Sequence, residues 1–297
     1  MTRSLRTPES FGTDAAVPFA WRTRRIDAAG TTLAAFEAGS DASDAPAVLL
    51  LHGLGHWTDA AWGRLIPYLD PSLRYAGFDL PGFGASGKPD VRYDRAFFRR
   101  AVDDASAALG LRRFALLGHS LGGFIAADWA GEHPQRVTHL ALVAPAGFSA
   151  PPRHLFYALL ARAAGKPLTA LAPSDRLVRR VLEHAVHDPS ALDPAHVERA
   201  YALAQDAAVR RAFAGIYAAA LETFTSTRRS RRRFARYTGP VLCAWGRHDR
   251  YIPPTTLDAV RSAYAGVSTL VLERSGHLPM LEEPESLAAP LRNFFRT

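Results

Sequence analysis

One stretch, residues 114–129, constrains the fold more than any other part of the chain. The apolar run 114–117 is typical of a buried strand, and residues 124–129 have helical spacing. Between them, residues 118–122 read Gly-His-Ser-Leu-Gly, so a glycine stands two residues before and two residues after Ser120. Each glycine removes a side chain where the backbone must fold back on itself. The pattern predicts a sharp turn from strand to helix that exposes the Ser120 hydroxyl at the end of a sheet.

Strand and helix patterns alternate on both sides of this turn. Alternation at this spacing predicts right-handed crossovers and a doubly wound, mostly parallel, eight-stranded α/β sheet with helices on both faces. The first two strands are joined across residues 29–30 and are expected to form a hairpin. Strands are predicted at 21–28, 31–37, 47–51, 75–80, 114–117, 137–143, 241–245 and 269–273, and helices at 62–69, 95–109, 121–131, 255–264 and 284–295.

The alternation stops after Pro145 and resumes near residue 241. The intervening segment contains helical signals only: 154–164, 175–187 with Leu177, Val181 and Ala185 on one face, a helix that opens at Asp193 and Pro194, and 207–224. Because strands return afterwards, we expect an all-helical insertion that forms a cap on one sheet. The predicted organisation is a flexible N-terminal arm at 1–20, a core at 21–147 and 238–297, and a helical cap at 148–237.

Parallel sheets hold their chemistry beyond the carboxyl ends of the strands. Four such ends carry polar or glycine-rich residues here: the Ser120 turn, 52–55, 246–249 and 275–277. Ser120, Asp249 and His277 follow one another along the chain in the order that accompanies this kind of serine turn. The order indicates a Ser-His-Asp catalytic triad.

With these pieces in place, the chain resembles α/β-hydrolase fold enzymes that carry a helical cap. The resemblance covers nearly all of the chain from residue 21 onward, through His52 and Gly53, the loop 79–86, the serine turn, 246–249, and Gly276 and His277 followed by 282–285. It implies that Ser120 is the nucleophile, His277 the base and Asp249 the acid that orients it. The backbone N–H groups of Leu121 and Leu54 are the implied oxyanion hole. No cofactor and no metal ion are expected.

A serine at the turn also narrows the reaction. Relatives that open epoxides or remove halide from carbon have an aspartate at this position, whereas Ser120 points to acyl chemistry. We expect a carboxylesterase-like enzyme that cleaves small-molecule esters through an acyl-enzyme on Ser120. Thioester or carrier-linked acyl hydrolysis, acyl transfer and carbon–carbon bond hydrolysis stay open with the same triad, as does a ligand receptor that barely turns over.

The walls of the substrate pocket are less well defined by the sequence. The candidates are His56, Trp57, Phe83, His119 and Phe148. We expect His52 and His119 to pack or hydrogen-bond locally, His248 to be a surface neighbour of Asp249, and the loop 79–86 to be a structural turn.

The net charge of +8 is concentrated in the predicted cap. Residues 146–236 contain fourteen Arg and one Lys against seven Asp and Glu, which equals the excess of the whole chain. The simplest interpretation is a solvated cationic face. The alternative is a site for an acidic partner: an acyl carrier protein, a coenzyme A thioester or an anionic lipid surface. Nucleic acid is not expected, because aromatic residues are not interleaved with the densest cluster, Arg228, Arg229, Arg231, Arg232 and Arg233.

The expected location is the cytoplasm. Residues 1–20 have no apolar core typical of a signal peptide, and no stretch approaches the eighteen apolar residues of a transmembrane segment. The single cysteine, Cys243, lies in an apolar run and is predicted to be a buried core residue.

Overall fold

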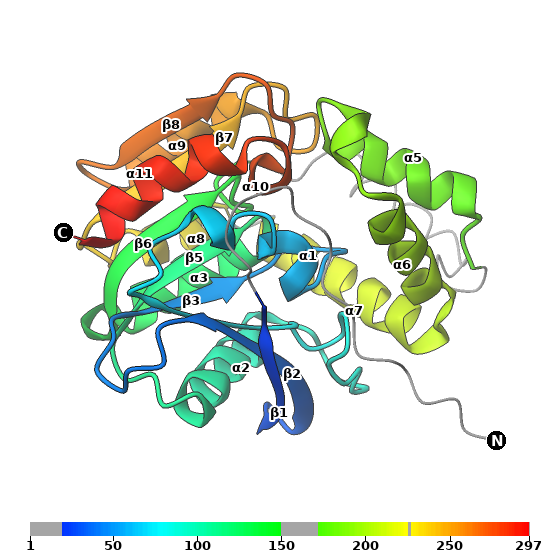
Figure 1. The fold of residues 1–297 in the computed structure, drawn as a ribbon, viewed down its shortest axis with the longest axis horizontal. Helices are drawn as coiled ribbons and strands as arrows, with labels where there is room; N and C mark the ends of the chain where they lie inside the picture. The colour runs from blue at the N-terminus through cyan, green and yellow to red at the C-terminus, as the bar shows by residue number, and fades with distance from the viewer. Residues whose placement is uncertain (1–19, 150–171, 225–226, 297) are drawn as a thin grey trace.

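A computed structural model describes residues 20–149, 172–224 and 227–296. Almost all of the expected N-terminal arm and the helix expected at 154–164 lie outside these ranges. Eight strands form one sheet in the order β1-β2-β4-β3-β5-β6-β7-β8 (Figure 1). The pairs β1-β2 and β2-β4 are antiparallel and the others are parallel, which confirms the predicted mostly parallel α/β sheet. The strands are β1 (Arg22–Ala28), β2 (Thr31–Gly39), β3 (Ala47–Leu51), β4 (Arg74–Phe78), β5 (Phe114–His119), β6 (Val137–Val143), β7 (Val241–Gly246) and β8 (Ser268–Leu272).

Helices cover both faces of the sheet. Strand residues alternate between two apolar clusters: Leu49 and Leu51 join one, and Val48 and Leu50 join the other. The described helices of the two layers are α1 (Thr58–Trp62), α2 (Arg95–Ala108), α3 (Leu121–Glu132), α8 (Thr227–Phe234), α9 (Leu257–Ala263), α10 (Pro279–Glu282) and α11 (Pro284–Arg296), with short 3₁₀ turns at Ile66–Tyr68, Pro134–Arg136 and Pro254–Thr256. The first cluster includes residues of α2, α3, α8 and α9, and the second includes residues of α1, α10 and α11.

Three further helices lie together to one side of the sheet (Figure 1). They are α5 (Asp175–Ala185), α6 (Pro194–Gln205) and α7 (Ala207–Phe224), with a 3₁₀ turn at Pro189–Ala191. The Ser174 side chain accepts a hydrogen bond from the N–H of Leu177 at the start of α5, and Asp193 accepts one from Ala195 at the start of α6. The start of α6 at Asp193 and Pro194 therefore agrees with the sequence.

Two local predictions were wrong, and two helices were not predicted. The helix expected at 62–69 is instead α1, which ends at Trp62, followed by a 3₁₀ turn. Helices α8 and α10 were not predicted, because α8 is arginine-rich and α10 has only four residues. Leu177 and Val181 do not share a buried face with Ala185: each is 51 % exposed, whereas Ala185 is buried.

No helix among the described residues combines the length and apolar character needed to cross a bilayer.

Candidate active site

Ser120 occupies a strained turn between β5 and α3. Its backbone has φ 51° and ψ −113°, a region that residues other than glycine rarely adopt. The turn is held because the Ser120 N–H donates to Val143 O at 3.0 Å, while Ser120 O accepts from the N–H groups of Phe124 and Ala146. A Cβ at Gly122 would collide with the carbonyl oxygens that end β3, so the second glycine of the motif is sterically required.

Ser120, His277 and Asp249 come together although they lie far apart in the sequence. The Ser120 hydroxyl is 3.0 Å from Nε2 of His277, and Nδ1 of His277 is 2.7 Å from Oδ2 of Asp249. All three residues are buried. With Nδ1–H donating to the carboxylate, Nε2 is left as the acceptor for the serine proton. The arrangement has the geometry of a base-activated serine.

Four donors surround the Asp249 carboxylate. Oδ1 accepts the backbone N–H groups of Tyr251 and Ile252, at 2.8 and 2.9 Å. Oδ2 accepts His277 Nδ1–H and the indole N–H of Trp245, the latter at 3.1 Å. These contacts fix the carboxylate and stabilise its negative charge. Sequence reasoning did not identify Trp245 as part of the site, since its strand position is equally typical of a core residue.

The backbone around His277 is held on both sides. Its N–H donates to Ala185 O, at the end of α5, at 2.6 Å. Its carbonyl oxygen accepts Nε2–H of His119 at 2.9 Å. His119 therefore makes the local hydrogen bond expected from the sequence, and its partner is the backbone of His277.

The two N–H groups implied as an oxyanion hole lie on segments next to Ser120. Leu121 is the first residue of α3, where backbone N–H groups have no partner within the helix. Leu54 follows Gly53, and Gly53 lies so close to Ser120 that an added Cβ would be 3.1 Å from the serine Cβ. The role of these two N–H groups stays a prediction.

Side chains from α6 and α7 contact the loops that follow β3 and β4. His196 of α6 has its ring centroid 5.4 Å from that of His56 and 5.0 Å from that of Trp57. Phe213 of α7 packs against Phe83, with ring centroids 5.3 Å apart. Neither His196 nor Phe213 was identified from the sequence, because contacts between the insertion and the core leave no local pattern.

The predicted pocket residues divide into two groups. His56 and His119 lie with their ring centroids 6.2 Å apart, while Trp57 contacts His196 of α6 and Phe83 contacts Phe213 of α7. Phe148 packs elsewhere: its ring lies 4.8 Å from Phe234 and 6.0 Å from Tyr264. Phe148 is therefore placed as a core residue beside α8 and α9.

Four histidines near the turn are buried, and burial lowers the pKa of each. Burial lowers the pKa of His52 and of His196 to about 4, and lowers the pKa of His56 and His119 well below the usual range. The hydrogen bonds of His52 define its tautomer, with the proton on Nδ1. Leu80 N–H donates to Nε2 at 2.8 Å, and Nδ1–H donates to Gly53 O at 2.9 Å. Throughout the described ranges, no three His, Cys, Asp or Glu side chains are grouped so as to hold a metal ion.

Three secondary expectations agree with the structure. Asp79 is buried and accepts the N–H groups of Thr58 and Ala85, as a structural turn requires. His248 is exposed and stacks on His187 with ring centroids 3.8 Å apart. Cys243 is fully buried.

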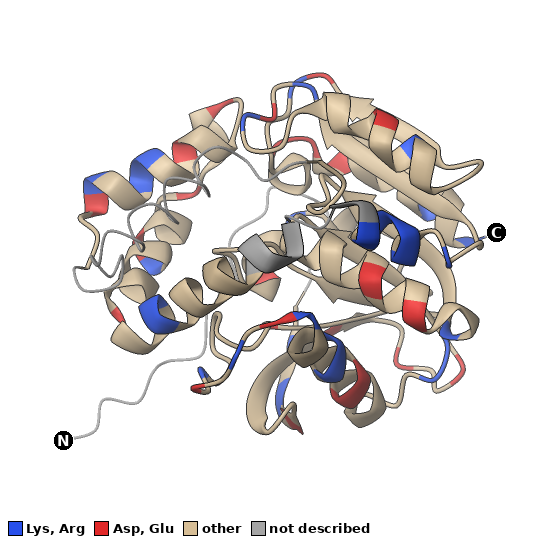
Figure 2. Cartoon of the chain, turned by 180° about the vertical axis from the view of Figure 1, so that it is seen from behind, with Lys and Arg blue, Asp and Glu red and all other residues tan. Residues whose placement is uncertain are grey.

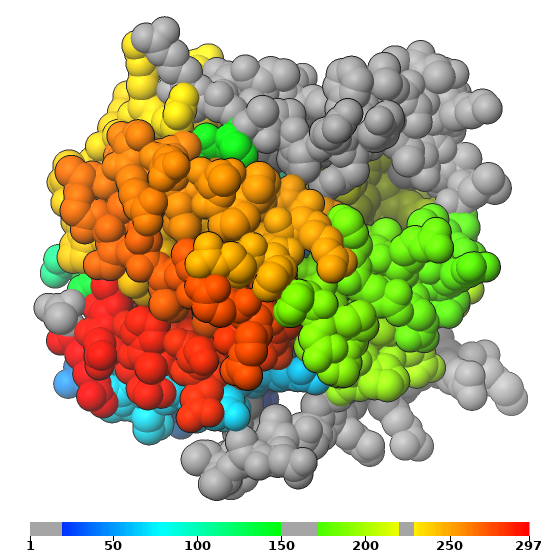
Figure 3. Space-filling model, turned by 90° about the horizontal axis from the view of Figure 1, so that it is seen from above, coloured from blue at the N-terminus to red at the C-terminus, as the bar shows by residue number. Residues whose placement is uncertain are grey.

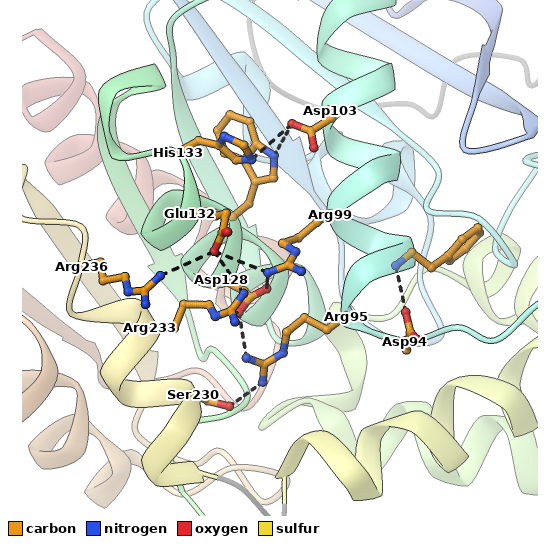
Figure 4. Close-up of polar contacts among 12 residues, drawn as sticks. Asp94, Arg95, Arg99, Asp103, Asp128, Glu132, His133, Ser230, Arg233 and Arg236 are labelled. Carbon is orange, nitrogen blue, oxygen red and sulfur yellow. Dashed lines mark hydrogen bonds and ion pairs between the residues drawn. The ribbon is translucent and has the colours of Figure 1, made fainter.

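Arg233 of the α8 cluster forms ion pairs, whereas other arginines of the cluster are exposed. Figure 2 shows that α8 carries a concentration of Lys and Arg, and Figure 4 shows how part of it is paired. Arg233 lies 3.6 Å from Asp128 and 3.2 Å from Glu132, both on α3. Arg229 and Arg232 are exposed. Arg233 therefore joins α8 to α3, and the exposed part of the cluster is smaller than the sequence suggested.

Comparison with known proteins gives one family match and several similar proteins. The family model described as alpha/beta hydrolase fold matches residues 46–284. A probable 1-acylglycerol-3-phosphate O-acyltransferase of Oryza sativa subsp. japonica is 36% identical over 116 residues, which is 37% of this chain and 28% of the rice protein. The chain thus spans less than a third of that relative.

Two solved structures are similar over almost the whole chain. The 2-hydroxy-6-oxo-6-phenylhexa-2,4-dienoate hydrolase from Rhodococcus sp. strain RHA1 has a TM-score of 0.79 and 26% identity, covering 94% of this chain and 100% of that one. A bacterial membrane phospholipase A has a TM-score of 0.70 and 27% identity, covering 93% of this chain and 86% of that one.

Proposed function

This chain belongs to the alpha/beta hydrolase fold family, and from that premise we propose that it is a serine hydrolase of carboxylic esters. The observation that carries the proposal is the pair of hydrogen bonds joining Ser120 to His277 and His277 to Asp249, at 3.0 and 2.7 Å. A serine hydroxyl is a weak nucleophile unless a neighbouring base accepts its proton.

The proposed reaction proceeds through an acyl-enzyme. Ser120 Oγ attacks the ester carbonyl carbon while His277 Nε2 takes the hydroxyl proton, and Asp249 stabilises the imidazolium that forms. The N–H groups of Leu121 and Leu54 would receive the negative oxygen of the tetrahedral intermediate. His277 then returns the proton to the leaving alcohol. Water, activated by the same imidazole, cleaves the acyl-enzyme and restores Ser120.

The test is steady-state hydrolysis of p-nitrophenyl esters of graded acyl length, with Ser120→Ala as the matched variant. Intact-mass analysis after a fluorophosphonate counts the reactive serines. We expect turnover and a single phosphonyl label in the parent protein, and neither in Ser120→Ala. Retention of most ester turnover by a folded Ser120→Ala protein would contradict the proposal.

A second candidate reaction is hydrolysis of a carbon–carbon bond beside a ketone. The observation that favours it is the similarity to the Rhodococcus dienoate hydrolase, which covers all of that chain at 26% identity. The same test separates the two reactions. A single label with almost no turnover of any ester would move the carbon–carbon reaction, a thioester substrate and a ligand receptor ahead of ester hydrolysis. Product analysis on a vinylogous 1,5-diketone would then identify the first of these.

An acidic partner at the arginine cluster is supported by the exposure of Arg229 and Arg232 on α8. Replacing these two by Ser, with Arg233 kept because it pairs with Asp128, should slow turnover of an acidic or carrier-linked substrate. A small neutral ester should be hydrolysed at the parent rate. Equal rates of the variant and the parent on both substrates would exclude the partner.

A further inference from the structure

Helix α5 ends against the loop that carries His277. The C-terminal residue of α5, Ala185, accepts the His277 N–H at 2.6 Å. Gly276 is in close contact with the same segment, since a Cβ there would lie within 2.8 Å of His187 N and of Ala185 O. In Figure 3 the green surface that contains α5 adjoins the orange surface of the C-terminal strands and loops.

One carboxylate, that of Glu282, connects these two segments. Its Oε1 accepts the backbone N–H groups of His187 and Asp188, at 2.6 and 3.2 Å. Its Oε2 accepts the N–H of Gly276, the residue before His277, at 2.7 Å. Glu282 is the last residue of α10, so its backbone is fixed by the helix while its two oxygens contact different parts of the chain.

The Asp249 loop has a matching connection to α5. Tyr251 N–H donates to Asp249 Oδ1, and the Tyr251 hydroxyl donates to Val181 O at 2.8 Å. The Tyr251 ring also lies 5.4 Å from the His277 ring, edge to face. The acid and the base of the triad are thus both held by residues that contact the last turns of α5.

We propose that Glu282 is a positioning residue that ties α5 to the His277 loop, so that the triad is correctly assembled only while α5 is docked. The expected effect on activity rests on the proposed serine mechanism. The structural link between α5 and the His277 loop does not depend on that mechanism. Displacement of α5 would remove the partners of His277 N–H and of Tyr251 OH together. Because errors of about 1 Å in a catalytic group cost about 100-fold in rate, docking of α5 would control the reactivity of Ser120.

Glu283 supplies a matched control. Its Oε2 accepts the Arg274 N–H and the Ser275 hydroxyl, at 2.9 and 2.6 Å, so its hydrogen bonds stay within the C-terminal loop. Glu282→Gln leaves one acceptor oxygen and places an NH₂ donor against an N–H group, so one of the two connections is lost. Glu283→Gln makes the same chemical change one residue away without touching α5.

The test combines amide hydrogen exchange with the rate of fluorophosphonate labelling of Ser120. In Glu282→Gln we expect faster exchange in both 185–188 and 276–277, and labelling slower by about 10- to 100-fold. Glu283→Gln should leave exchange in 185–188 at the parent rate and labelling within about threefold. Tyr251→Phe, which loses the hydroxyl bound to Val181, should also slow labelling, and it provides a second route if Glu282→Gln folds poorly.

Labelling of Glu282→Gln within twofold of the parent rate, or faster exchange confined to 276–277, would overturn the coupling. Amide hydrogen exchange reports on the two segments whether or not Ser120 is reactive. If Ser120→Ala kept ester turnover, the proposed function would fail, whereas coupled exchange of the two segments would still stand.

Discussion

Trp245 donates its indole N–H to Oδ2 of Asp249, the same oxygen that contacts His277 Nδ1. The N–H is shared with Ile252 O at 2.8 Å, so one buried side chain fixes both the carboxylate and the loop that carries it. We expect Trp245→Phe to lower kcat by roughly 10- to 100-fold with little change in KM, since a hydrogen bond to a charged group contributes about 1.5–3 kcal/mol and each 1.4 kcal/mol is about a factor of ten in rate. Steady-state kinetics on the best p-nitrophenyl ester measure this.

The control is Trp62→Phe. Trp62 is also fully buried, and within the described residues its indole N–H has no hydrogen-bond partner. Its replacement should leave kcat unchanged. Equal kcat values for Trp245→Phe and the parent protein would show that the indole N–H does not orient Asp249.

Asp249→Asn should lower kcat far more than Trp245→Phe does. The amide NH₂ would donate to His277 Nδ1 and favour the tautomer in which Nε2 carries the proton, so Nε2 could not accept the serine proton. We expect kcat to fall by about 10³- to 10⁴-fold while the fold is retained. Circular dichroism checks folding and single-turnover acylation measures the rate. A loss of less than tenfold would assign the orienting role to another acid.

Stability should decrease as the pH is lowered from 7 toward 4. The pKa values of His52, His56, His119 and His196 are all lowered by burial. The unfolded chain, with histidine pKa values near 6.5, therefore binds more protons than the folded protein in this window. The stabilisation is fully present above about pH 6.5 and is lost as the pH falls toward the folded values. Each such histidine adds a slope of about 1.4 kcal/mol per pH unit below 6.5.

Urea unfolding at pH 7.5, 6.0 and 5.0 measures this dependence. His196→Leu removes one titrating group whose Nε2 has no hydrogen-bond partner among the described residues, so the slope should decrease by about 1.4 kcal/mol per pH unit. An unchanged slope would mean that His196 is protonated in the folded protein.

Asp128→Asn should destabilise the protein by about 2–4 kcal/mol. Asp128 is buried and pairs with Arg95, Arg99 and Arg233 at 3.0, 3.7 and 3.6 Å, so its neutral replacement leaves three guanidinium groups facing one another (Figure 4). Chemical denaturation gives the free energy of unfolding. Arg232→Gln, an exposed neighbour on α8, should change it by less than about 0.5 kcal/mol. Similar losses in both variants would contradict a role for the Asp128 network.

Features of the fold and site could be predicted from the sequence where the sequence pattern is local or where the order of the strands determines the contact. Strand β6 has the predicted bounds Val137–Val143, because an apolar run flanked by turns defines a buried strand without tertiary information. The contact among Ser120, Asp249 and His277 was predictable because each follows a strand, and parallel strands place their carboxyl ends at one edge of the sheet.

Other features depend on contacts between distant segments. Helix α8 has arginine on most of its surface, yet Phe234 is fully buried and Ser230 accepts a hydrogen bond from Arg95. His196 reaches the loop after β3 only because α6 packs over it. Leu177 and Val181 have the spacing of a buried face, but α5 packs through Leu182 and Ala185 instead. Local periodicity carries no information on which partner a helix meets.

The separation of the triad along the chain has a consequence for biosynthesis. Ser120 follows β5, near the middle of the chain, whereas His277 follows 157 residues later, after the final strand of the sheet. A nascent chain therefore contains Ser120 before it contains His277, the base that would accept the proton of the hydroxyl in the proposed mechanism. Asp249 and His277 follow β7 and β8, the last two strands of the chain to be synthesised. A fragment that ends before residue 277 lacks the base that the proposed mechanism requires, so we expect it to be inactive as a serine hydrolase.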